Sequence, residues 1–325
     1  MPKALWITGP GRAELRETPL PPRGPDEVTV RLLASGISRG TERLVWQGRI
    51  PPSQYALMRA PLQEGDFPFP VKYGYCAVGL AEDGALAGRR VFVLAPHQER
   101  FLAPAALCTP LPEALPTRRA VLAANMETAL NALWDAQPLP GERALVIGAG
   151  VVGLLAAFLL AQIPGMRVTV TDLDPGRAAI AQTLGARFAA PEEAPAEQEL
   201  ILHASATEAG LALALSRAAF EARIIEASWF GTDCPALPLG EAFHQKRLRL
   251  ISTQVGSIAP AMRGRRSHAE RMALALELLA DERLDMLLGP VVPFAELPAR
   301  YGALLTEPAL CPVVTCEQES TGCSA

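Results

Sequence analysis

The chain has 325 residues, of which 50% are hydrophobic and 20% are charged, a composition typical of a globular protein. That length allows two domains, each with its own core. The formal net charge of −4 argues against a nucleic-acid partner or an anionic membrane surface.

The N-terminus begins with a strand-like segment and has no signal-peptide pattern. The apolar stretch at 151–163 is shorter than the ~20 residues that a membrane span needs. The sequence therefore predicts a cytoplasmic protein that does not interact with membranes. Six cysteines lie scattered without C-x-x-C spacing, which favours reduced thiols over a disulfide framework.

The first ~115 residues contain short strand-like runs separated by turns rich in proline and glycine. The runs lie at 28–34, 77–81 and 90–94, and a turn such as 19–25 contains several prolines. No long helical period is evident in this part of the chain. The pattern predicts an irregular, mostly antiparallel β domain.

After Pro116 the pattern changes to alternating strands and helices. A helix is expected at 117–136, followed by strands at 144–147, 168–171, 200–203, 223–227 and 248–252, with helices at 175–184, 207–218 and 239–246 between them. This alternation predicts an α/β fold with a doubly wound parallel sheet covered on both faces. A further helix is expected at 267–280, and 291–294, 297–305 and 312–315 indicate a final β/α segment.

The strand at 144–147 leads into Gly148, Gly150 and Gly153, a G-x-G-x-x-G turn that opens the apolar helix at 151–163. Gly148 allows the tight turn, Gly150 lets the backbone approach a pyrophosphate, and Gly153 lets helix and strand pack closely. The backbone at Val151 and Val152 starts the helix, whose N-terminus favours phosphate charge. The spacing predicts a Rossmann dinucleotide-binding unit.

Asp172 ends the second strand of this unit, where a carboxylate accepts hydrogen bonds from the adenosine ribose hydroxyls. Because a carboxylate repels a 2′-phosphate, Asp172 favours NAD over NADP. Arg177 lies nearby and is a candidate to contact either the ribose or a phosphate, which leaves NADP as the alternative.

The leader, the dinucleotide unit and the C-terminal segment together resemble the medium-chain dehydrogenase/reductase superfamily over the whole chain. The matching segments are Ala34-Ser-Gly-Ile-Ser, Phe69-Pro-Val-Lys-Tyr-Gly-Tyr and Gly88-Arg-Arg-Val-Phe-Val. Ser38-Arg-Gly-Thr-Glu42 more specifically resembles a zinc-free branch that includes bacteriochlorophyllide a dehydrogenase.

The resemblance implies a GroES-like β-barrel catalytic domain at 1–116, a Rossmann domain at 117–262, and a helix and return segment at 263–325 that completes the catalytic domain. It also implies an active site between the two domains. We further expect a small-molecule substrate and a homodimer.

Zinc-dependent members of this family carry a cysteine, a Gly-His-Glu and a further Cys or Glu. This sequence has Ser38, Gly74-Tyr75-Cys76 and Glu127 at the matching positions. Hydroxyl, phenol, thiol and a single carboxylate make a poor zinc site. The structural zinc loop is also missing, because only 94–98 lie between two strand-like runs. We therefore expect no zinc, with a weak metal at Cys76 and Glu127 as the alternative.

Without a metal, another group must stabilise or protonate the developing alkoxide. The resemblance implies Tyr75 as the first candidate for the acid/base, followed by Thr41 and Ser38 and then by Glu127. Each also has a structural interpretation: Tyr75 as a pocket wall, Thr41 and Glu42 as a turn cap, and Glu127 as a helix N-terminal carboxylate. His97 belongs to the later part of the predicted barrel.

Loops that follow the later strands are expected to hold the nicotinamide end of the cofactor, Ser205 among them. His203 is interpreted as a structural or cofactor-edge histidine, and Trp229 and Phe230 as a substrate wall or packing residues. The basic run at 263–268 is either an anion site or a solvated loop.

The sequence thus predicts a zinc-independent, NAD-linked oxidoreductase acting on an alcohol/carbonyl pair. A zinc-free reductase of activated C=C bonds and a non-catalytic nucleotide-binding redox sensor are the alternatives.

Overall fold

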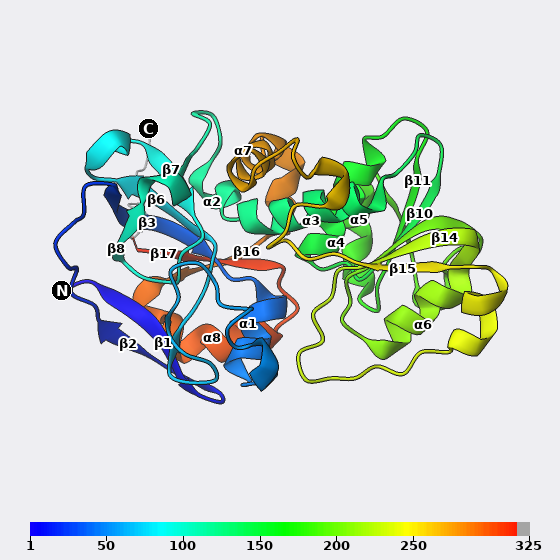
Figure 1. The fold of residues 1–325 in the computed structure, drawn as a ribbon, viewed down its shortest axis with the longest axis horizontal. Helices are drawn as coiled ribbons and strands as arrows, with labels where there is room; N and C mark the ends of the chain where they lie inside the picture. Colours follow the sequence, from blue (N-terminus) through cyan, green and yellow to red (C-terminus); the bar gives the residue numbers. More distant parts are fainter. Residues whose placement is uncertain (317–325) are drawn as a thin grey trace, which may run out of the picture. The chain divides into compact units, whose positions relative to one another are not determined.

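The computed structural model describes residues 1–316, which divide into two compact units (Figure 1). Unit 1 contains Met1–Ala124 and the chain from Leu288 onward, and unit 2 contains Asn125–Leu287. Cys323 lies outside the described residues.

Unit 2 is built on a six-stranded sheet in the order β12-β11-β10-β13-β14-β15, with every neighbouring pair parallel. The strands are β10 (Arg143–Ile147), β11 (Arg167–Thr171), β12 (Arg187–Ala189), β13 (Gln198–His203), β14 (Ala218–Glu226) and β15 (Arg249–Ser252). The strand order reverses direction between β10 and β13, and in such sheets ligands bind at the carboxyl ends of the strands flanking that point. This topology confirms the predicted doubly wound parallel sheet.

The helices of unit 2 are the remainder of α3 (Ala123–Ala136), α4 (Val151–Ala161), α5 (Ala178–Thr183), α6 (Glu208–Arg217) and α7 (His268–Leu278). Helix α4 packs on β10 and β11, and α6 packs on β13 and β14. Residues Gly153–Leu160 of α4 are all buried, because this helix is apolar on every side.

Two predicted helices differ from the structure. The segment at 239–246 is only a π-type turn at Leu239–Phe243, interrupted at Glu241 by a non-helical conformation. Pro238 and Gly240 oppose regular helix there. The predicted helix at 117–136 is two helices, α2 (Thr117–Ala120) and α3, and Val121 at the break lies against Gly36.

Unit 1 contains two sheets (Figure 1). The larger has the order β16-β17-β3-β6-β7-β9, with β8 also paired to β3, and the smaller has the order β2-β1-β5-β4. Their strands are β1 (Lys3–Gly9), β2 (Arg12–Glu17), β3 (Glu27–Gly36), β4 (Glu64–Gly65), β5 (Val71–Lys72), β6 (Ala77–Ala81), β7 (Arg90–Val93), β8 (Arg100–Pro104), β9 (Thr109–Pro110), β16 (Leu288–Pro293) and β17 (Cys311–Thr315). The C-terminal β17 pairs antiparallel with β3, so the end of the chain completes the N-terminal sheet.

Unit 1 also contains a short helix that the sequence analysis did not expect, α1 (Arg39–Trp46). Three of its residues, Glu42, Leu44 and Val45, are buried. Helix α1 packs against α8 (Leu297–Thr306), which also contacts β2. Short 3₁₀ turns lie at Pro52–Gln54, Gly84–Leu86, Ala105–Leu107, Pro175–Arg177, Pro191–Glu193, Pro260–Met262, Glu282–Leu287 and Phe294–Glu296.

The boundaries of the two units differ from the ranges expected from the sequence. The first falls inside α3 rather than at 117, and the return to unit 1 begins at Leu288 rather than at 263. The second difference arises because α7 belongs to unit 2, where its Arg271 side chain is buried against α3.

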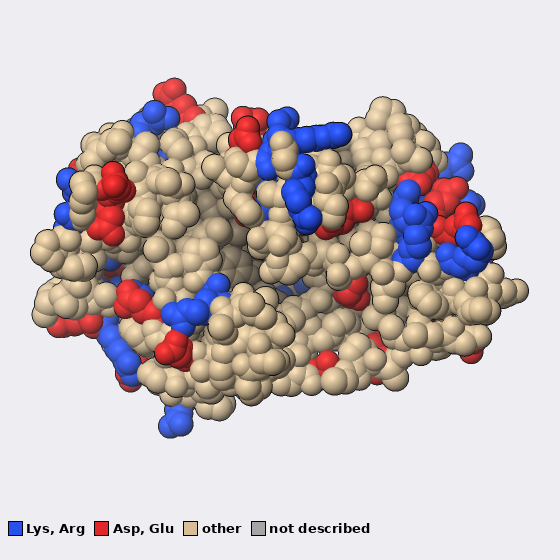
Figure 2. Space-filling view, viewed as in Figure 1, with Lys and Arg blue, Asp and Glu red and all other residues tan. Residues whose placement is uncertain are grey.

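No helix among the described residues is long and apolar enough to cross a membrane. On the face shown in Figure 2, basic and acidic side chains lie in small mixed groups.

Candidate functional site

The glycine turn joins β10 to α4 and is closed toward the protein by two of its glycines. Gly148 has a φ of +104°, and a Cβ there would lie 2.8 Å from the Ser205 backbone nitrogen. A Cβ on Gly153 would lie 2.0 Å from the carbonyl oxygen of Gly148. Both positions therefore require glycine for the turn itself.

Gly150 is different, since it is exposed and a Cβ there would meet no heavy atom within 4 Å. The turn is thus open on the side where a pyrophosphate would approach. Leu154 donates to the Gly150 carbonyl, so the backbone N–H groups of Val151 and Val152 have no partner within α4 and are suited to an anion. These residues fit the dinucleotide predicted from the motif.

The Asp172 carboxylate follows β11 and lies beside the glycine turn. Its Oδ2 accepts from the Ala149 backbone N–H at 2.6 Å, and its Oδ1 accepts from the Asp174 N–H at 2.9 Å. The Arg177 guanidinium forms an ion pair with Asp174, with 3.1 Å between Nε and Oδ2. The carboxylate therefore stands at the predicted position, and the nearby guanidinium is held by another acid.

Ser205 follows β13, next to the glycine turn, and its hydroxyl belongs to a chain of hydrogen bonds. Its Oγ lies 2.7 Å from Nε2 of the buried His203, whose Nδ1 lies 2.7 Å from Oε2 of Glu226. The Phe230 ring stacks on the His203 imidazole with 6.2 Å between centroids. Phe230 therefore packs on the histidine, in agreement with its interpretation as a packing residue.

Two of the catalytic candidates in unit 1 contact each other. The hydroxyls of Tyr75 and Ser38 are hydrogen-bonded, and both side chains are half-buried. Burial, followed by the effects of Cys76, Tyr73 and Glu42, raises the pKa of Tyr75 well above its usual value. Tyr75 is therefore a neutral phenol at physiological pH. Thr41 lies in the first turn of α1 and is half-buried.

Glu42 is the centre of a buried polar cluster that the sequence analysis did not assemble. Its Oε1 accepts from the Ser38 backbone N–H at 2.7 Å, and its Oε2 accepts from the Tyr301 hydroxyl at 2.6 Å. The same Oε2 lies 2.9 Å from Nε2 of His97, whose Nδ1 lies 2.8 Å from the Ser35 hydroxyl. Glu42 does bond the start of α1, as a turn cap would, but it also orders two further side chains.

The sequence contained a signal for only part of this cluster. Tyr301 shares the apolar face of α8 with Leu297, Leu304 and Leu305, and that periodicity indicates an inward-facing tyrosine. Nothing in the local sequence links it to Glu42, because the contact joins α8 to α1 across most of the chain.

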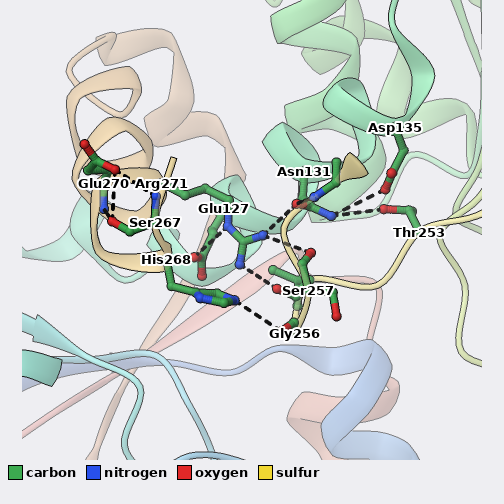
Figure 3. Close-up of polar contacts among 12 residues, drawn as sticks. Glu127, Asn131, Asp135, Thr253, Gly256, Ser257, Ser267, His268, Glu270 and Arg271 are labelled. Carbon is green, nitrogen blue, oxygen red and sulfur yellow. Dashed lines mark hydrogen bonds and ion pairs between the residues drawn. The ribbon is translucent and has the colours of Figure 1, made fainter. Parts of the chain in front are cut away.

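Glu127 of α3 is engaged by an arginine. The Arg271 Nε donates to Glu127 Oε1 at 2.9 Å, and its Nη1 donates to Asn131 Oδ1 at 2.6 Å (Figure 3). Arg271 also donates to the carbonyls of Val255 and Ser257. Burial raises the pKa of Glu127, and the adjacent guanidinium opposes that shift. Glu127 therefore joins α3 to α7, which supports its structural interpretation.

The residues at the family's zinc-ligand positions do not fit a zinc ion. Tyr75 and Ser38 bond each other, and burial raises the pKa of the Cys76 thiol well above its usual value, which opposes the thiolate that zinc needs. Glu127 is paired with Arg271. Within residues 1–316, no group of three His, Cys, Asp or Glu side chains is arranged to hold a metal.

No protein-family model matches the chain. The chain is 24% identical to a zinc-type alcohol dehydrogenase-like protein of Haemophilus influenzae, over 94% of this chain and 96% of the relative. A short chain alcohol dehydrogenase of E. coli CFT073, complexed with NADH, superposes with a TM-score of 0.78 at 18% identity, over 97% of this chain and 99% of that one.

The quinone oxidoreductase of Thermus thermophilus, known also as its NADPH complex, superposes with a TM-score of 0.72 at 27% identity, over 96% of this chain and 99% of that one. The chain has the fold of the medium-chain alcohol dehydrogenases. Its relatives and structural neighbours together support a place in the medium-chain dehydrogenase family. The H. influenzae relative is described as zinc-type, whereas the donor set of this medium-chain fold, within residues 1–316, does not suit zinc.

Proposed function

We propose that the protein is a zinc-independent, NAD-dependent oxidoreductase of the medium-chain family that interconverts an alcohol and a carbonyl compound. One observation carries this proposal: the glycine turn is open at Gly150, and the Asp172 carboxylate is fixed beside it by the Ala149 N–H. A carboxylate at this position accepts from ribose hydroxyls and repels a 2′-phosphate, so NAD is favoured over NADP.

The cofactor, when bound, supplies or accepts the hydride. The glycine turn and the start of α4 hold its pyrophosphate, and Asp172 holds its ribose. For carbonyl reduction, a proton must reach the oxygen that becomes the alcohol. The Tyr75 phenol is a neutral donor with its hydroxyl fixed by Ser38, so we assign it the proton transfer. In the reverse direction, the Tyr75 oxygen receives the alcohol proton.

Reduction of an activated C=C bond is a second candidate. The donor set of the described residues does not suit zinc, and the neighbour with the highest sequence identity among those described above is a quinone oxidoreductase. For this reaction Tyr75 would protonate the carbon or oxygen that carries the developing negative charge.

A screen of alcohols, aldehydes, ketones, enones and quinones, including large ring systems, tests these assignments through the change in NAD(H) absorbance. Turnover of alcohol/carbonyl pairs supports the first candidate, and turnover of enones alone supports the second. NAD binding without turnover of any compound would favour a redox sensor. Tighter binding of NADP than of NAD by calorimetry would contradict the cofactor assignment.

Zinc independence is tested on protein purified without added metal. We expect well under about one zinc per chain by elemental analysis, because the donor set lacks thiolate and imidazole ligands at the family positions. Activity should persist in a strong chelator. Stoichiometric zinc that is lost together with activity would contradict the proposal and place the protein with the zinc-dependent members.

A further inference from the structure

The chain of hydrogen bonds behind Ser205 contains a titratable side chain that the proposed reaction does not use. It runs from Thr207 through Ser205 and His203 to Glu226. The Oγ atoms of Thr207 and Ser205 are 2.9 Å apart, and each end of the His203 ring lies 2.7 Å from its next partner. His203 and Glu226 end neighbouring parallel strands and are register partners, so the sheet itself sets this geometry.

The chain of hydrogen bonds ends beside the glycine turn. The Gly148 Cα packs on the Ser205 backbone, since a Cβ there would lie 2.8 Å from the Ser205 nitrogen and 2.9 Å from its Cα. Ser205 is half-buried, while His203 is fully buried. Ser205 is thus the member of the chain that can reach a ligand at the turn, and His203 stands behind it.

The protonation state of His203 decides what Ser205 can offer. Thr207 Oγ1 accepts from the Gly210 N–H, which leaves its own proton for Ser205 Oγ. When the imidazole is neutral, Nδ1–H donates to Glu226 and Nε2 accepts the Ser205 proton, so Ser205 presents only a lone pair. When the imidazole is protonated, Nε2–H donates to Ser205, and the Ser205 proton is released toward a ligand acceptor.

Few groups surround the ring. Glu226 from the end of β14 is the titratable group that faces it, and its carboxylate favours the imidazolium. Gly210 of α6 packs on the ring, and the loop after β14 contributes Phe230 and the Ser228 hydroxyl, 3.4 Å from Nδ1.

We propose that the Ser205–His203–Glu226 chain couples binding of the dinucleotide to uptake of a proton by His203, so that the Ser205 hydroxyl donates to an acceptor oxygen of the bound cofactor. This inference rests on the proposed function. The oxygens of the pyrophosphate are acceptors only, so the bound cofactor favours the state in which Ser205 is a donor. The proton comes from solvent and returns to it when the cofactor leaves.

The test is calorimetric titration of the full chain with NAD between about pH 6.5 and 8, in pairs of buffers with different ionisation enthalpies. For wild-type protein the apparent heat should depend on the buffer and report uptake of up to about one proton per chain, the capacity of one imidazole. NAD affinity should weaken as pH rises, because the proton becomes less available.

Ser205→Ala should bind NAD several-fold more weakly and with heats that no longer depend on the buffer, and Glu226→Gln should move the uptake to lower pH. His203→Gln should abolish the uptake, and the half-buried Ser205 keeps the test decisive where a change at the buried histidine prevents folding. His244→Gln, at an exposed histidine of the same unit, is the control and should retain the wild-type uptake.

Wild-type binding of NAD with equal heats in both buffers would overturn the coupling and leave the proposed function standing. Uptake that survives Ser205→Ala at full affinity would also overturn it. No binding of NAD at all would contradict the proposed function and the coupling together.

Discussion

Gly153 meets the carbonyl oxygen of Gly148 so closely that a Cβ on Gly153 would lie only 2.0 Å from that oxygen. The contact brings the first turn of α4 onto the end of β10 and fixes the shape of the loop between them. Gly150, in the same loop, has no comparable neighbour, since a Cβ there would meet nothing within 4 Å. The two glycines therefore serve different ends, one for the fold and one for the ligand.

Alanine at these two positions should separate folding from cofactor binding. Gly153→Ala should lower the free energy of unfolding by about 1–3 kcal/mol or more, as overpacking in a close-packed interior does. Gly150→Ala should leave the unfolding free energy within about 0.5 kcal/mol and weaken NAD binding by about tenfold or more, or about 1.4 kcal/mol. Urea denaturation and calorimetry measure the two quantities, and a stable Gly153→Ala variant with normal NAD affinity would contradict this assignment.

Local chemistry made the unit 2 sheet predictable. Short apolar runs such as 144–147 are typical of buried strands, and the glycines mark the turn that follows. The position of Asp172 next to that turn follows from the order of the strands. The helix predicted at 239–246 was wrong because the composition of that segment is helical while Pro238 and Gly240 break the backbone.

Contacts between distant segments could not be predicted in the same way. The bond from Tyr301 to Glu42 spans 259 positions in the chain, and the ion pair of Arg271 with Glu127 spans 144. Each residue looked ordinary in its own helix. His203 and Glu226 were within reach of sequence reasoning, because residues that end adjacent parallel strands lie side by side once the register is known.

Asp172 is expected to set the choice between NAD and NADP. Asp172→Ser removes the carboxylate that accepts from Ala149 and Asp174, so NAD should bind about tenfold more weakly. The discrimination against NADP should fall, because no negative charge then opposes the 2′-phosphate. Calorimetric titration with both cofactors measures the ratio. Asp281→Asn, which alters an acid paired with Arg283 on the surface, is the control and should leave that ratio unchanged.

Arg271 is expected to hold α7 on α3. Arg271→Leu leaves the Glu127 carboxylate buried without its partner and should cost about 3–5 kcal/mol of unfolding free energy. Glu127→Gln combined with Arg271→Leu should recover part of that loss, since no unpaired charge remains buried. Denaturation in urea at constant pH measures both variants. Equal stability of Arg271→Leu and wild-type protein would show that the ion pair is dispensable for joining the helices.

Tyr75 is expected to act as the proton donor in carbonyl reduction. Tyr75→Phe removes only the hydroxyl, so the ring should still pack against Tyr73 while turnover falls by ~10²–10⁴, the usual contribution of a general acid. NAD affinity should change little. Tyr73→Phe removes a phenol hydroxyl from the same buried group and is the control, with turnover within about threefold of wild type, well inside that range.

The pH dependence distinguishes a proton donor from a wall of the pocket. The raised pKa of Tyr75 keeps the phenol protonated through neutral pH, so reduction should lose rate only as pH rises through that raised value. The Glu42 carboxylate contributes to the shift, and Glu42→Gln removes its charge. The descending limb of the kcat/KM profile should therefore move to lower pH in that variant. If Tyr75→Phe instead retains turnover within about threefold of wild type, the tyrosine is a wall, and Thr41, Ser38 and Glu127 are the next candidates for the acid.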